Sequence, residues 1–307
     1  MRKCFLTFGR AAAAAAVATA GFTLVGCAAP LPAADRLPGT RGEARAELRR
    51  LAERPVPAAR PVLLLGGWGD LVFGMRRTRA MLRGVLLPPD GSGAASRGGD
   101  GLRGTGGTDA GPPDPFVLVN HGIFGSFDGY RDRLIARLQR AFPSDEPGTT
   151  VPVDVVAHSM GGLLARYAAL PRDDGGRRLR IVRLFTTATP HRGARMAWLS
   201  PLDATARAMR PGSAVLQRLD DAWPDRDYRV FAYVRSRDEV VGVQRTRPPT
   251  GRLYWTDARW YERAHVGAKY DPRIVLHTAR VLRGEAEGTP KVAPPLPDWP
   301  GRAAGRL

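Results

Sequence analysis

The stretch from residue 153 to residue 168 constrains the fold of this chain more than any other part of it. Its sequence is V-D-V-V-A-H-S-M-G-G-L-L-A-R-Y-A. A short and largely apolar run, 153–157, stops at a cluster of small and polar residues, and an apolar helical pattern then begins at Leu163. This order predicts a buried strand, a sharp turn and a helix.

The turn is close to the motif G-x-S-x-G, with Ala157 at the first glycine position. In that motif a strained turn lifts the serine hydroxyl clear of the sheet, so the sequence predicts Ser159 as a nucleophile. Gly161 and Gly162 let the helix start close against the strand. The backbone N–H of Met160 would lie at the helix N-terminus, where it can stabilise an oxyanion. A plain turn with a chance serine is the alternative, which the full A-H-S-M-G-G string disfavours.

Apolar runs and helical patterns alternate along the rest of the chain. Strands are expected at 61–65, 116–120, 151–157, 180–187, 228–234 and 253–256. Besides the helix after Ser159, helices are expected at 42–54, 75–86, 130–142, 194–222 and 272–282. This alternation predicts an α/β fold with a mostly parallel central sheet and helices on both faces.

Segments of low hydrophobicity set the expected domain organisation. Residues 28–60 are expected to form a tether and a short helix, and residues 61–283 a single α/β domain. Residues 89–114 are almost devoid of apolar side chains, so we expect a disordered insertion there. The Pro/Gly-rich tail, 284–307, is also expected to be disordered.

Residues 1–27 have the pattern of an export signal. A basic start precedes a small apolar run, 11–25, which is too short for a comfortable transmembrane helix. The run ends in L-V-G-C, which resembles the lipobox of bacterial lipoproteins, where the cysteine, here Cys27, becomes lipidated. The resemblance implies an exported protein anchored by lipid to the cell envelope, at the outer membrane or the periplasmic face. An ordinary secretory signal and a secreted protein are the alternative.

Cysteine content and charge exclude several kinds of function. Cys4 and Cys27 are the only cysteines, so the chain beyond the signal has no disulfide, thiol nucleophile or cysteine-ligated zinc. The net charge of +18 comes almost entirely from arginine. It would suit an anionic surface, although coding bias explains it equally. No basic stripe is interleaved with aromatic residues, so we expect no nucleic-acid partner. The sequence does not indicate the oligomeric state.

A nucleophilic serine needs a base, and the base needs an orienting acid. In doubly wound hydrolases these follow the serine in the order acid, then histidine. Asp238 is the candidate acid, because it lies in the turn after the expected strand 228–234. Glu239 and Asp257 remain alternatives for the same role.

The candidate base is His265, which follows the last expected strand and precedes the last helix. The other histidines fit the role less well. His277 lies inside the last helix, His158 adjoins the serine and should point away from it, and His121 and His191 lie in loops close to glycines.

Two loops could supply the second oxyanion donor: G-G-W at 66–68 and H-G-I-F-G at 121–125. A helix, a strand and another helix normally separate this loop from the serine. The second loop lies 37 residues before Ser159 (159 − 122), which leaves room for one helix only. The first lies 92 residues before it (159 − 67), or 66 without the 26-residue insertion, which is enough for all three. Spacing therefore favours the backbone N–H of Trp68.

From about residue 61 to 282 the chain resembles α/β-hydrolase lipases. The matching motifs are A-H-S-M-G-G, T-P-H-R-G at 189–193, the turn with Asp238, and A-H-V-G at 264–267. The resemblance extends to bacterial triacylglycerol lipases and GPI-inositol-deacylase-like proteins. It implies cleavage of acyl esters, including lipids, through a serine acyl-enzyme, and it implies no metal or cofactor. The chain departs from the family at Gly66, where a histidine is often found, and in its long insertion.

The same triad could also serve acyl transfer to an alcohol, or amide or thioester cleavage. A non-catalytic surface lipoprotein with this fold is a further alternative, but it requires the loss of a triad residue, and none is lost. The stretch 194–222 is expected to form either a lid or acyl-binding cap, or ordinary core helices. Its apolar residues include Met196, Trp198, Leu199, Met209 and Leu216.

Overall fold

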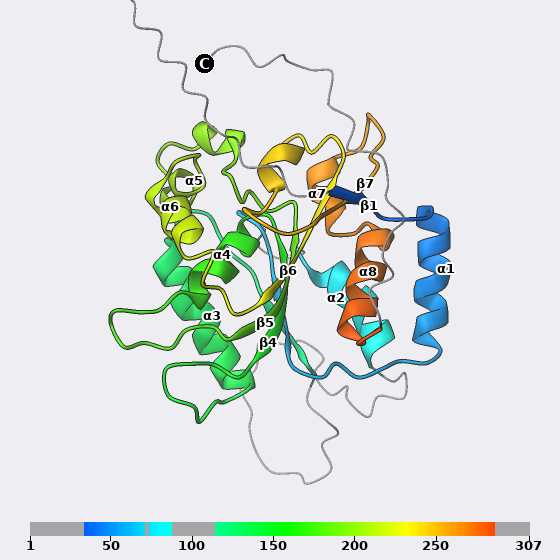
Figure 1. Cartoon of the computed structure of the whole chain (residues 1–307), viewed down its shortest axis with the longest axis horizontal. Coiled ribbons are helices and arrows are strands. Elements are labelled where there is room, and N and C mark those ends of the chain that lie inside the picture. Colours follow the sequence, from blue (N-terminus) through cyan, green and yellow to red (C-terminus); the bar gives the residue numbers. More distant parts are fainter. Residues whose placement is uncertain (1–33, 71–73, 88–113, 286–307) are drawn as a thin grey trace, which may run out of the picture. The chain divides into compact units, whose positions relative to one another are not determined.

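A parallel sheet organises the described part of the chain. The computed structural model describes residues 34–70, 74–87 and 114–285. Within these ranges seven strands pair in the order β1-β7-β6-β5-β4-β2-β3, and every pairing is parallel (Figure 1). The strands are β1 (Ala34–Arg36), β2 (Val62–Leu65), β3 (Phe116–Val119), β4 (Val153–His158), β5 (Ile181–Thr187), β6 (Arg229–Arg235) and β7 (Leu253–Thr256).

Helices cover both faces of this sheet. On one face pack α3 (Phe127–Ala141), α4 (Met160–Ala169) and α6 (Ala214–Asp221), and on the other α1 (Arg41–Ala52), α2 (Arg76–Leu86) and α8 (Pro272–Leu282) (Figure 1). The strands β2 and β4 are buried at every residue, as expected of strands covered on two sides. The predicted α/β fold, with a mostly parallel sheet and helices on both faces, is confirmed by this arrangement.

The cap segment, residues 194–222, differs from the continuous helical pattern of its sequence. It forms three short helices, η1 (Arg195–Leu199), α5 (Ala204–Ala208) and α6. Pro201 follows the first of these and Pro211 follows the second. Proline lacks a backbone N–H and clashes with the preceding turn, so it divides the segment.

The segment 28–60 also differs from the expected tether and helix. Residues Ala34–Arg36 pair with β7 in the register Ala34 to Leu253, and they form an edge strand of the sheet. Helix α1 begins with a capping box between Thr40 and Glu43 and packs against α8. The tether expectation is therefore wrong for β1. Edge pairing uses backbone hydrogen bonds, which an Ala/Pro-rich composition does not reveal.

Several predicted segments lie outside the described residues. These are the signal with Cys27, the insertion 89–114 apart from Asp114, and all but the first two residues of the tail 284–307. None of the helices in the described ranges has the length and apolar character to cross a membrane.

A buried ion pair on β4 gives a test of this sheet. Asp154 is fully buried and accepts hydrogen bonds from Arg183 Nε (2.9 Å) on β5 and from Arg60 Nη1 (3.2 Å). Asp154→Ala leaves the Arg183 guanidinium without its carboxylate, so we expect the free energy of unfolding to fall by about 3–5 kcal/mol in urea titrations. The matched control, Asp174→Ala, breaks an exposed pair with Arg172 and should leave the unfolding midpoint nearly unchanged. Equal effects of the two changes would contradict the account.

Candidate active site

Ser159 occupies a strained turn between β4 and α4. Its backbone has φ 52° and ψ −127°, in the left-handed half of the map that residues with a side chain rarely adopt. Such strain persists only where the surroundings impose it. The backbone N–H of Ser159 donates to Thr187 O (2.9 Å), and Thr189 Oγ1 donates to Ser159 O (2.9 Å). The turn therefore has the geometry of a nucleophile elbow, and residues at and just beyond the end of β5 hold both its N–H and its carbonyl group.

The two glycines after the serine are required by close backbone approaches. A Cβ at Gly161 would lie 2.5 Å from Gly66 O and 2.8 Å from Leu65 O. A Cβ at Gly162 would lie 2.2 Å from Thr189 Oγ1. Helix α4 can therefore start against β2 and β5 only because these positions lack side chains.

The three residues nominated from the sequence as a triad lie in one hydrogen-bonded row. His265 Nε2 is 3.1 Å from Ser159 Oγ, and His265 Nδ1 is 3.0 Å from Asp238 Oδ2. All three residues are buried. Because the carboxylate accepts a hydrogen bond from Nδ1–H, the lone pair of the neutral ring lies on Nε2, facing the serine hydroxyl. Such a row can carry a proton away from Ser159 Oγ.

Backbone N–H groups orient the carboxylate of Asp238. Its Oδ1 accepts hydrogen bonds from the N–H groups of Val240 (3.0 Å) and Val241 (2.8 Å). The two alternative acids lie elsewhere. Glu239 Oε2 accepts from the backbone N–H of His265 (3.1 Å), and Asp257 pairs with Arg273.

His158 supports the backbone of His265. Its Nε2 lies 3.1 Å from His265 O. Burial, followed by the neighbouring charges of His265 and Lys269, lowers the pKa of His158 well below its ordinary value. The ring is therefore neutral, and Nε2–H donates to the carbonyl. The sequence predicts that His158 points away from the serine, but no pattern in it indicates this contact with His265.

The remaining histidines take no part in the row. His191 is buried between Arg166 Nη1 (3.1 Å) and Thr186 Oγ1 (3.2 Å). His277 Nδ1 lies 2.7 Å from Tyr233 Oη. In the part of the chain that the structure describes, no group of three or more His, Cys, Asp or Glu side chains could hold a metal ion.

The loop at residues 66–69, the GGWG loop, packs directly on the serine. It follows β2, the neighbour of β4 in the sheet. A Cβ added at Gly67 would lie 3.1 Å from Ser159 Cβ and 3.6 Å from Oγ. The competing loop, 121–125, follows β3 at the edge of the sheet, and its Phe124 N–H is already bonded to Asp203 Oδ2 (2.9 Å). The structure thus places the loop favoured by spacing beside Ser159.

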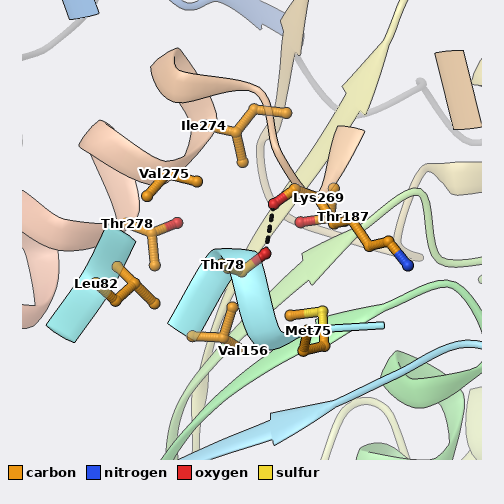
Figure 2. Close-up of a pocket in the computed structure, with 9 residues that line it drawn as sticks. All are labelled: Met75, Thr78, Leu82, Val156, Thr187, Lys269, Ile274, Val275 and Thr278. Carbon is orange, nitrogen blue, oxygen red and sulfur yellow. Dashed lines mark hydrogen bonds between the residues drawn. The ribbon is translucent and has the colours of Figure 1, made fainter. Parts of the chain in front are cut away.

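An ion pair ties the GGWG loop to the helix that carries His265. Lys269 Nζ lies 2.7 Å from Asp70 Oδ2, just beyond the loop, and Lys269 is the C-cap of α7 (Ala264–Ala268). Figure 2 shows Lys269 at a small cavity between α2 and α8, where Thr78 Oγ1 donates to Lys269 O (2.7 Å). This cavity has room for no more than about one water molecule, so it cannot hold an acyl chain.

The apolar residues of the cap segment divide into two groups. Met209 and Leu216 are buried in the core beside α4. Met196, Trp198 and Leu199 are exposed, the last at 70%. The segment is therefore part core and part apolar surface, and its motion as a lid remains a prediction.

No protein-family model matches the chain, and no curated protein matches it significantly. Among solved structures it is similar to phospholipase PlaB from Legionella pneumophila, with 12% identity and a TM-score of 0.40, over 59% of this chain and 40% of that one. Lipase BlEst2 from Bacillus licheniformis has 13% identity and a TM-score of 0.47, over 75% and 94% of the two chains. The lin2722 gene product from Listeria innocua has 15% identity and a TM-score of 0.47, over 73% and 93%. The chain spans about two fifths of the Legionella phospholipase. At such low sequence identities, the activities of these three proteins are not assigned to this chain.

The fit of the GGWG loop against the serine can be tested at Gly67. A Cβ there would also lie 3.2 Å from His158 Nδ1, so the loop must move away from the elbow by a few tenths of an ångström. We expect Gly67→Ala to fold but to lower the rate at which Ser159 reacts with a fluorophosphonate by about tenfold or more, since small misplacements of reacting groups are costly. Gly84→Ala in α2 is the control, because its Cβ meets nothing within 4 Å. An unchanged reaction rate in Gly67→Ala would contradict this packing.

Buried histidines should make the fold sensitive to mild acid. Burial and Arg133 lower the pKa of His121 to about 4, and burial holds the pKa values of His158 and His191 well below normal. The unfolded chain takes up these protons near pH 6.5, so stability should fall as pH drops from about 6.5 towards 4. Each histidine contributes about 1.4 kcal/mol per pH unit to the slope of the unfolding free energy.

Urea titrations at several pH values in this window measure that slope. His121→Gln should reduce it by the contribution of one proton. A free energy of unfolding that stays constant between pH 6.5 and 5 would show that these rings are protonated in the folded chain.

Proposed function

We propose that the chain is a serine carboxylic-ester hydrolase of the lipase or esterase type, working through an acyl-enzyme. The observation that carries the proposal is the hydrogen-bonded row of Ser159, His265 and Asp238 at a strained turn. A chance arrangement would not combine this row with a glycine-rich loop packed on the serine.

The geometry supports the following sequence of steps. His265 Nε2 takes the hydroxyl proton as Ser159 Oγ attacks the ester carbonyl, and Asp238 holds Nδ1–H and stabilises the imidazolium. The backbone N–H groups of Met160 and Trp68 hold the oxyanion, each worth roughly 3–4 kcal/mol of transition-state stabilisation. The leaving alcohol takes the proton from His265. Water, activated by the same ring, then attacks the acyl-enzyme and releases the carboxylic acid.

Lipid esters are the substrate class that we favour. Trp68 beside the serine is partly exposed, as are Ile123 and Phe124 on the adjacent loop and Trp198 and Leu199 of the cap segment. Exposed apolar groups on the segments that Asp203 links are typical of surfaces that bind apolar partners. Attachment to the cell envelope through a lipidated Cys27, with secretion as the alternative, is part of the same proposal.

The same acyl-enzyme would serve acyl transfer to an alcohol, or cleavage of an amide or thioester. The triad does not distinguish these reactions, because they share the first covalent step. Products formed in the presence of competing alcohols would separate hydrolysis from transfer.

The proposal predicts the activity of two variants on p-nitrophenyl esters from acetate to palmitate. Ser159→Ala should lower kcat by about a millionfold, the loss known for the triad serine of subtilisin. Asp238→Asn should lower it by about 10⁴-fold, as in the trypsin-like template, because the ring then holds the wrong tautomer.

Asp257→Asn is the matched control, since Asp257 is one of the alternative acids that the sequence offers. Its side chain is half exposed and pairs with Arg273. This variant should retain full activity. A wild-type chain that cleaves none of these esters would overturn the proposed function, and loss of activity in Asp257→Asn with retention in Asp238→Asn would overturn the assignment of the acid.

A further inference from the structure

A single buried carboxylate joins the cap segment to two loops, one of which, the GGWG loop, packs on Ser159. Asp203 is only 2% exposed and lies at the start of α5 in the cap segment. Its carboxylate accepts hydrogen bonds from the GGWG loop, from the loop 121–125 and from its own helix. We propose that Asp203 is a positioning residue for the reaction, which acts by fixing Trp68 and so the oxyanion donor. This inference rests on the proposed function.

The two carboxylate oxygens of Asp203 accept hydrogen bonds from different segments. Oδ2 accepts from Trp68 Nε1 (2.9 Å) and from the backbone N–H of Phe124 (2.9 Å). Oδ1 accepts from the backbone N–H groups of Thr205 (2.8 Å) and Ala206 (3.1 Å), so it caps α5. One oxygen therefore holds the cap segment, and the other holds the two loops.

Asp203 carries its negative charge at neutral pH. Burial opposes ionisation, but hydrogen bonds from Phe124, Thr205, Trp68 and Ala206 outweigh it and bring the pKa of Asp203 to about 2. Hydrogen bonds to an ionised acceptor are roughly twice as strong as neutral ones. The carboxylate is thus a firm anchor for both loops.

Trp68 needs such an anchor because glycines flank it. Gly66 and Gly67 precede it, and Gly69 follows with φ +71°. Glycine permits many backbone conformations, and the hydrogen bonds that close the loop on itself are long: 3.3 Å from Asp70 N–H to Gly67 O and 3.5 Å from Gly67 N–H to Asp70 Oδ2. On the C-terminal side the Asp70–Lys269 ion pair holds the loop, and at Trp68 itself the indole bond to Asp203 does so.

Phe124 depends on the same carboxylate. Its φ of 60° is costly for a residue with a side chain, and the residue is 75% exposed, so packing does not compensate. The bond from its N–H to Asp203 does. Asp203 thereby links exposed Trp68 and Phe124 to the cap segment, next to exposed Leu202.

Asp203→Asn separates the two roles of the side chain. Asparagine is as good a helix cap as aspartate, so its oxygen can still cap α5 while its NH₂ group meets two donors. We expect the variant to fold, with kcat lowered about tenfold to a hundredfold and KM changed far less, since one lost oxyanion donor costs 10²–10³.

Ser213→Ala is the matched control. Ser213 caps the neighbouring helix α6 through Leu216 N–H (3.3 Å) and does not touch the GGWG loop. It should keep wild-type kcat even if it melts at a lower temperature. Equal losses of kcat in Ser213→Ala and Asp203→Asn would reduce Asp203 to a structural cap and overturn the inference.

A double-mutant cycle tests the route through Trp68. Trp68→Phe removes the indole donor and keeps the backbone. If Asp203 acts through Trp68, the double variant should lose no more kcat than the more damaging single variant. Losses that multiply would show that the two residues act independently and would overturn the inference.

The rate at which a fluorophosphonate labels Ser159 gives a readout that needs no ester substrate. Asp203→Asn should be labelled more slowly than the wild type and Ser213→Ala, by a factor similar to the loss of kcat. A wild type that is labelled but cleaves no ester would refute the proposed function while leaving the labelling comparison intact. Labelling of Asp203→Asn at the wild-type rate would overturn the role of Asp203, and a wild type that is not labelled would overturn both.

Discussion

The backbone at Ser159 is held in a conformation that a residue with a side chain adopts only under constraint, and the rest of the site is arranged around it. Strain of this kind costs about 1–3 kcal/mol. The hydrogen bonds that stabilise this conformation against its strain involve Thr187 and Thr189, at and just beyond the end of β5. The missing side chains of Gly161 and Gly162 let α4 approach closely enough for these bonds to form. The strained serine is thus a property of the sheet, not of the turn alone.

The parallel sheet explains why residues far apart in the sequence meet at this turn. Parallel strands end on the same edge, so the segments after them lie together there. Ser159 follows β4, Asp238 follows β6, and His265 lies beyond β7. The GGWG loop follows β2, the neighbour of β4. Polar side chains then set the distances: Glu239 and His158 hold the backbone of His265, and Asp203 holds the loops on the other side.

Local patterns were enough to predict the strands of the sheet apart from β1, the fold class and three residues that the structure brings together. The serine lay in a motif, and chain order then nominated Asp238 and His265. Simple spacing favoured the GGWG loop. The edge strand β1 does not follow from the sequence, because backbone pairing leaves no side-chain pattern. The division of the cap segment into three helices does not follow either, because the apolar pattern of residues 194–222 favours a continuous helix although the segment contains Pro201 and Pro211. Asp203 was missed because its partners, Trp68 and Phe124, lie 135 and 79 residues away.

The most direct test of this account is the mass of the covalent intermediate. The chain would be mixed with p-nitrophenyl butyrate, quenched with acid within milliseconds, digested and analysed by mass spectrometry. The account predicts a butyryl group on the peptide that contains Ser159, and no such group on the Ser159→Ala chain. A butyryl group on another residue in the wild type, or turnover with no acylated peptide during a burst of p-nitrophenol, would contradict it.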